Sequence, residues 1–122
     1  MYFEIDFNSE EALYLQVCNQ IIQGIATSEF RNGDSLPSVR RLADSIGINM
    51  HTVNKAYTVL KQEGYVRVDG RRGTVIAVDA DKRDTLADLR MQLGPVVARS
   101  VSRNISKEEF ERVVASLYED YQ

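Results

Sequence analysis

The sequence predicts a mainly α-helical protein with a small β-hairpin, arranged as a winged helix-turn-helix domain followed by a short two-helix tail. Three patterns support this fold class. Two amphipathic helical patterns are separated only by Gly47-Ile48-Asn49, as in a helix-turn-helix. Two β-prone runs follow them and predict a hairpin that would form the wing. Two further helical patterns end the chain, so we expect the winged domain at residues 1–78 and the tail at residues 79–122.

The composition is that of a small globular protein. A length of 122 residues suits one domain with a short appendage, and 43% hydrophobic residues suffice for a core. The only cysteine, Cys18, cannot form an internal disulfide, which fits a reducing cytosol. No basic leader and no run of about 18 apolar residues is visible, so we expect a cytoplasmic protein without membrane contact.

The chain is expected to begin with an extended arm and a helix. Alternating apolar and acidic residues over residues 2–7 predict a short strand or extended arm with one buried face. The apolar residues of this arm are Phe3, Ile5 and Phe7. A helix is then predicted from Glu10 to about Ser28, with Glu10 and Glu11 in its first turn. Its apolar positions are Leu13, Val17, Ile21, Ile22 and Ile25.

Two short helices come next, after a turn at residues 31–34. Pro37 favours an extended residue before it, Ser38 is a suitable helix cap, and Gly47 ends the first helix. The second helix follows the tight turn and continues until Gly64. The predicted buried residues are Val39, Leu42, Ala43 and Ile46 in the first helix and Val53, Ala56, Tyr57 and Leu60 in the second.

A β-hairpin is predicted after these helices. Residues 65–68 and 74–78 are β-prone, and the glycine-bounded run at residues 69–73 forms the tip between them. Glycines let a backbone approach a nucleic-acid groove, and arginines favour the negative potential of a minor groove. The candidate contact residues at the tip are Gly70, Arg71 and Arg72. The alternative is a solvated turn.

The tail is predicted to be a dimerisation device. Residues 79–81 form a linker to a long helix, which Gly94-Pro95 should bend or weaken, and Ser106-Lys107-Glu108-Glu109 matches a capping box that starts the last helix. Two isolated helices bury too little surface to be stable alone, so we expect their apolar stripes to meet those of a second copy. The expected interface residues are Leu86, Leu89, Leu93, Val97, Phe110, Val113, Leu117 and Tyr121. The alternative is a monomer whose tail packs on its own winged domain.

Charge is unevenly distributed along the chain. The net charge of -3 argues at first sight against a nucleic-acid partner. Residues 31–75, however, contain eight basic and four acidic residues, which gives this segment a charge of +4. Because cations on a docking face release counterions from DNA phosphates, the helix-turn-helix and wing are the candidate nucleic-acid surface.

The second helix of the motif contains the candidate base-reading residues, because helices of this kind enter the major groove with their N-terminal turn. Asn54 can bond adenine through two hydrogen bonds, His51 can contact a base edge or a phosphate, and Thr52 can reach a phosphate. Met50 and Lys55 also lie outside the predicted core face. The alternative is an ordinary solvated helix face, which the neighbouring helix and hairpin disfavour.

The first helix of the motif crosses the phosphate backbone in this geometry. Arg40 and Arg41 lie in its first turn and are candidate phosphate contacts. The alternative for either arginine is an ion pair with Asp44 on the same helix.

Much of the chain between residues 8 and 78 follows a specific pattern. Its matching stretches are Leu13-Tyr14-Leu15-Gln16-Val17, Gly33-Asp34-Ser35-Leu36-Pro37-Ser38-Val39-Arg40, Leu42-Ala43, Gly47-Ile48-Asn49, Thr52-Val53-Asn54-Lys55-Ala56-Tyr57, Leu60, Glu63-Gly64 and Gly70-Arg71-Arg72-Gly73-Thr74-Val75. These stretches resemble the GntR family of bacterial transcription regulators. The short tail, Ile5-Asp6-Phe7-Asn8-Ser9 and the Asn49-x-x-Thr52-Val53 turn are most similar to its YtrA subfamily.

This resemblance implies a dimeric repressor, frequently of operons that encode ABC transporters, and regulation by a small-molecule effector. The residues that it implicates in DNA contact are Arg40, His51, Thr52, Asn54 and Gly70. Met50 departs from the arginine common at its position in the wider family, and methionine cannot bond a guanine edge as arginine does.

The sequence therefore predicts a regulator that binds palindromic double-stranded DNA and represses its own operon. An enzyme is not expected, nor is a cofactor or metal, because there is no glycine-rich phosphate loop and no set of paired metal ligands. The alternative is a winged-helix module that binds protein or structured RNA without operator specificity.

Overall fold

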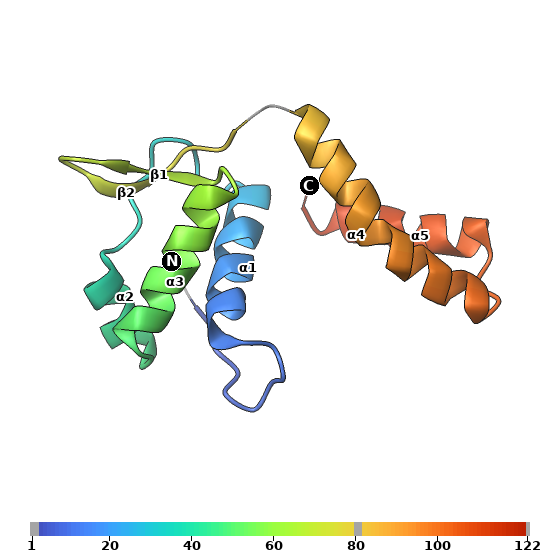
Figure 1. Ribbon diagram of the computed structural model, residues 1–122, viewed down its shortest axis with the longest axis horizontal. Helices are drawn as coiled ribbons and strands as arrows, with labels where there is room; N and C mark the ends of the chain where they lie inside the picture. Colours follow the sequence, from blue (N-terminus) through green and yellow to red (C-terminus); the bar gives the residue numbers. More distant parts are fainter. Residues whose placement is uncertain (1–2, 80–81, 122) are drawn as a thin grey trace. The chain divides into compact units, whose positions relative to one another are not determined.

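The computed structural model describes residues 3–79 and 82–121, which contain five helices and a two-stranded hairpin (Figure 1). The elements are α1 (Leu13–Ala26), α2 (Val39–Ile46), α3 (Met50–Gln62), β1 (Val66–Asp69), β2 (Gly73–Ile76), α4 (Lys82–Ser102) and α5 (Lys107–Glu119). The predicted mainly helical fold, with a winged helix-turn-helix and two C-terminal helices, is confirmed. The chain divides into two compact units, Met1–Asp79 and Ala80–Gln122, and each is described by itself below.

Helix α3 is the central element of the first unit, because both α1 and α2 pack against it (Figure 1). Val53, Ala56 and Leu60 of α3 are fully buried, as are Val17 and Ile21 of α1. Burying a valine, leucine or isoleucine side chain stabilises a fold by roughly 1.5–3 kcal/mol. The apolar spacing in the sequence therefore identified the core face of these helices.

The turn between α2 and α3 is set by local capping. The Ser38 hydroxyl accepts a hydrogen bond from the N–H of Arg41 at the start of α2, and the Asn49 side chain accepts one from the N–H of His51 at the start of α3. Gly47 ends α2 with a φ of 74°, a left-handed conformation that glycine adopts without strain. These three residues orient the exposed start of α3.

The wing is an antiparallel hairpin in which Val66 pairs with Ile76 and Asp69 pairs with Gly73. The segment before α2 pairs with β2 on the side away from β1, a contact that the sequence did not reveal. Leu36 donates its N–H to the Thr74 carbonyl at 2.8 Å, and Ser35 forms a β-bridge with Val75. The base of the wing is thus hydrogen-bonded to the chain that leads into α2.

The N-terminal arm is extended, but it forms no strand over its described residues, and residue 2 lies outside them. Its backbone is paired by side chains of α1: Gln20 bonds both the N–H and the carbonyl of Glu4, and Gln16 does the same for Asp6. Phe7 is 61% exposed, so the predicted buried face does not extend to it.

Helix α1 is shorter than predicted, since it begins at Leu13 and not at Glu10. Ala12 is the N-cap, so Glu10 and Glu11 lie before the first turn. The side-chain amide of Gln16 donates a hydrogen bond to the Glu11 carbonyl at 3.0 Å. At the other end, Ser28 lies beyond the helix.

In the second unit, α4 runs without a break through Gly94 and Pro95, so this pair does not end the helix. Pro95 has no N–H to bond the carbonyl four residues earlier, so the helix lacks one backbone hydrogen bond there, and the predicted bend or weakening stays a prediction. The predicted capping box of α5 is confirmed, because the Ser106 hydroxyl accepts from the N–H of Glu109 while the Glu109 carboxylate accepts from the N–H of Ser106. The predicted linker at residues 79–81 lies largely outside the described residues.

Candidate nucleic-acid interface

The first two turns of α3 present an exposed polar face. His51, Asn54 and Lys55 are exposed, Met50 is 42% exposed, and Thr52 is half-buried. Side chains of the opposite face form the core, so the predicted division between core and outward positions agrees with the structure. This face has the amide of Asn54, the imidazole of His51 and the ammonium group of Lys55. In a helix-turn-helix, the start of the second helix is the part that enters the major groove of DNA.

A shallow groove of about 430 Å³ lies where the first turns of α1 and α3 meet. Its lining residues are Leu13, Tyr14, His51, Thr52 and Lys55. The Lys55 ammonium lies 4.0 Å from the centroid of the Tyr14 ring, an arrangement in which the ring face attracts the cation. Lys55 is therefore held over α1, beside His51 and Thr52.

Sequence reasoning missed Tyr14 as part of this surface. One feature of the sequence indicates that Tyr14 lies at the surface. It follows Leu13 at the edge of the apolar stripe, and its side chain has a polar hydroxyl. Nothing local indicated its pairing with Lys55, which depends on how α1 packs against α3.

Both arginines of α2 are exposed, and neither forms an ion pair with Asp44 in the part of the chain that the structure describes. They differ in their surroundings. Arg41 lines a cavity beside Pro37 and Leu42, whereas Arg40 does not. Arg40 thus remains the simpler candidate for a phosphate contact.

The wing tip is ordered by Asp69. Its carboxylate accepts hydrogen bonds from the N–H groups of Arg71 at 2.9 Å and Arg72 at 3.3 Å. These two bonds, with smaller contributions from the charges of Arg67 and Arg72, lower the pKa of Asp69 from its ordinary value. The Arg72 guanidinium donates a hydrogen bond to the Gly33 carbonyl, and both Arg71 and Arg72 are exposed.

The predicted interface residues of the tail are largely exposed within the second unit. Phe110 is half-buried, and the other seven predicted interface residues are between 36% and 61% exposed. Helices α4 and α5 are not among the closely packed pairs of elements. The second unit thus has apolar side chains that its own helices do not cover.

No group of three or more His, Cys, Asp or Glu side chains in residues 3–79 and 82–121 could hold a metal ion. Within the same ranges, no helix has both the length and the apolar character needed to cross a membrane.

The chain is similar to known regulators over most of its length. Residues 13–76 match the family described as bacterial regulatory proteins, gntR family. The HTH-type transcriptional regulator YhcF of Bacillus subtilis is 33% identical over 84% of this chain and 87% of its own length. The HTH-type transcriptional repressor YtrA of the same organism is 37% identical over 74% of this chain and 68% of its own.

Solved structures have the same fold. A transcriptional antiterminator from Listeria monocytogenes is 27% identical, with a TM-score of 0.86 over 96% of this chain and 90% of that one. YtrA from Sulfolobus acidocaldarius is 37% identical, with a TM-score of 0.66 over 82% and 97%. The DNA-binding domain of AraR, in complex with an operator, is 27% identical, with a TM-score of 0.51 over 62% and 94%. The chain therefore belongs to the gntR family of bacterial regulatory proteins, and within that family it is YtrA-like.

Proposed function

We propose that this protein is a dimeric transcriptional repressor that acts in the cytoplasm and binds a palindromic operator, rather than an enzyme. The main supporting observation is the exposed start of α3, where His51 and Asn54 stand clear of the core on a helix flanked by cationic groups of α2 and the wing. The operator complex of the AraR domain and the repressor name of YtrA lend support from relatives.

Each group has a distinct role in this proposal. Asn54 reads an adenine in the major groove, and Arg40 neutralises a phosphate. His51, Thr52 and Lys55 line the groove between α1 and α3. In this proposal they contact the phosphate backbone of the DNA beside the base that Asn54 reads. Met50 offers an apolar surface to the bases. Arg71, supported by Gly70 and Arg72 at the wing tip, approaches the minor groove or the adjoining backbone.

The tail supplies the two-fold symmetry. Exposed apolar patches mark interaction sites, and the stripes that include Leu89 and Leu93 on α4 and Leu117 on α5 fit the same stripes of a second copy. The two reading heads would then meet half-sites about 10 bp apart, or a multiple of that distance. The proposed target is the protein's own operon, with genes for a transporter. The proposed effector is a small molecule.

The test is binding to a palindromic duplex from the protein's own promoter. Asn54→Ala should weaken binding about tenfold or more, since one good base contact is worth ~1–3 kcal/mol. Gln62→Ala removes an amide from the far end of the same helix and should leave affinity unchanged. Arg40→Ala should also flatten the salt dependence of binding by about one unit of slope. Equal affinities for wild type and Asn54→Ala would reject the proposed site.

A second candidate function is binding to structured RNA. The observation that favours it is the description of the Listeria monocytogenes structure as a transcriptional antiterminator. A hairpin RNA transcribed from the same promoter region distinguishes the two functions. Tighter binding to that RNA than to the duplex would favour this second candidate.

A further inference from the structure

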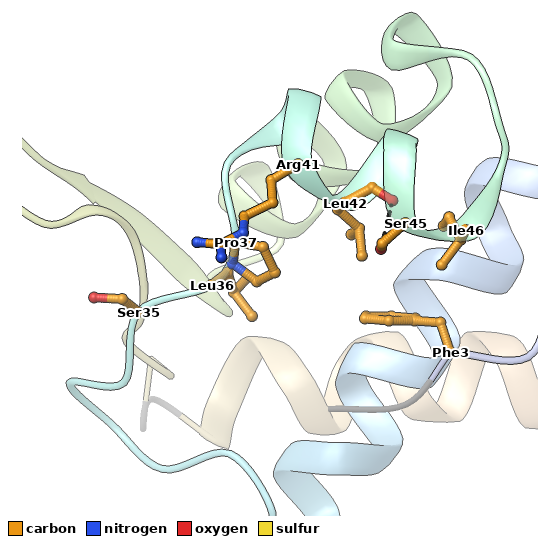
Figure 2. A pocket seen from close by; sticks show the side chains of 8 residues that line it. All are labelled: Phe3, Ser35, Leu36, Pro37, Arg41, Leu42, Ser45 and Ile46. Carbon is orange, nitrogen blue, oxygen red and sulfur yellow. Dashed lines mark hydrogen bonds between the residues drawn. The ribbon is translucent and has the colours of Figure 1, made fainter.

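A cavity of about 770 Å³ lies beside α2, outside the α1–α3 groove (Figure 2). Its lining residues are Phe3, Ser35, Leu36, Pro37, Arg41, Leu42, Ser45 and Ile46. They come from the N-terminal arm, the segment that bridges to the wing, and α2. Pockets of this size commonly hold small molecules.

The lining has the chemistry of a site for an amphipathic anion. Its apolar wall includes the Phe3 ring, which faces Leu42 from the arm (Figure 2). Arg41 is the only charged residue of the lining, and its side chain extends from α2 toward Pro37. No acidic residue lines the cavity, and the Arg41 guanidinium has no ion-pair partner within the described residues.

We propose that this cavity binds a small organic carboxylate with a flat apolar body. The guanidinium fork matches a carboxylate through two parallel hydrogen bonds. The Phe3 ring can stack against a flat apolar group, and Leu42 and Ile46 offer further apolar contact. Ser45 already donates its hydroxyl proton to the Leu42 carbonyl at 3.0 Å, so its oxygen can serve only as an acceptor for the ligand.

Pro37, which lines the cavity, is hydrogen-bonded to α3. The Pro37 carbonyl accepts a hydrogen bond from the Tyr57 hydroxyl of α3 at 2.7 Å. A ligand between Phe3 and Pro37 thus contacts a segment bonded directly to α3. If the proposed function holds, the ligand also neutralises a cation of α2 and weakens binding to DNA.

The experiment uses the full chain without DNA, so its outcome is independent of the proposed function. Benzoate is titrated while backbone amide chemical shifts are followed by NMR, with benzyl alcohol and inorganic phosphate as the uncharged and non-apolar controls. We expect saturable shifts at Ser45 and Ile46 with benzoate. Both controls should bind at least tenfold more weakly.

Two variants of adjacent residues assign the anion contact. Arg41→Gln should weaken benzoate binding at least tenfold, whereas Arg40→Gln removes the same charge outside the cavity and should leave it unchanged. Phe3→Ala should also weaken binding. Shifts without saturation, equal losses in the two arginine variants, or equal binding of inorganic phosphate would each overturn the proposal.

Discussion

Two buried ionisable residues, Cys18 and Tyr57, make the stability of the first unit sensitive to alkaline pH. The Cys18 thiol donates to the Ala56 carbonyl at 3.4 Å. Burial, together with the nearby charge of Glu63, raises the pKa of Cys18 from 9.0 to about 11. Burial also raises the pKa of the Tyr57 hydroxyl. Because both groups ionise more readily in the unfolded chain, their contribution is complete below the unfolded pKa and is lost as pH rises through the folded one.

We therefore predict that the free energy of unfolding falls between pH 9 and 11, the range bounded by the two pKa values of Cys18. A shift of this size corresponds to a loss on the order of 2 kcal/mol. Cys18→Ala should show a shallower fall, because only the contribution of Tyr57 remains. Urea unfolding at pH 7, 9 and 11 measures the effect, and an identical fall in the variant would contradict the assignment.

At the residue scale, contacts between residues close in the sequence could be predicted, and contacts between distant residues could not. The caps at Ser38 and Ser106 were predictable because each acts on the backbone three residues away. The Lys55–Tyr14 contact and the bond from Arg72 to Gly33 were not, since each joins separate elements. The outward set on α3 was predictable because helical periodicity alone separates it from the core.

At the scale of elements, the arm along α1 shows how side chains replace a strand partner. Alternation predicted an extended arm, which is correct, but no periodic signal reveals that two glutamines would pair its backbone. The pairing of Ser35 with β2 was hidden for a related reason. A single bridge leaves no alternating pattern in the sequence.

Gln20→Ala should release the start of this arm. Its two hydrogen bonds with Glu4 measure 2.8 and 2.6 Å, and each such bond is worth ~0.5–1.5 kcal/mol. Hydrogen exchange of the Glu4 amide should accelerate about tenfold, with little change at Asp6, which Gln16 holds. Asn19→Ala, on the exposed neighbour, is the control. Equal exchange at Glu4 in both variants would show that Gln20 does not retain the arm.

At the scale of the whole molecule, the charge pattern and the tail have complementary consequences. The segment at residues 31–75 has eight basic and four acidic residues, but the complete chain has a net charge of -3. Weak non-specific attraction to DNA is the expected result, since such attraction follows the number of phosphates neutralised. In the proposed dimer, the tail links two DNA-binding units, and such a link raises the affinity for a palindromic operator.

The apolar stripe of α5 is the part of the tail that is expected to join two copies of the chain. Leu117 is 54% exposed on the apolar stripe of α5, so Leu117→Asp should place a charge in the proposed dimer interface and yield a monomer by sedimentation velocity. Ala115→Asp introduces the same charge on the opposite face of α5 and should leave the dimer intact. Both variants should keep the folded first unit, which has its own core. A monomeric wild type, or a dimer that survives Leu117→Asp, would exclude this stripe as the interface.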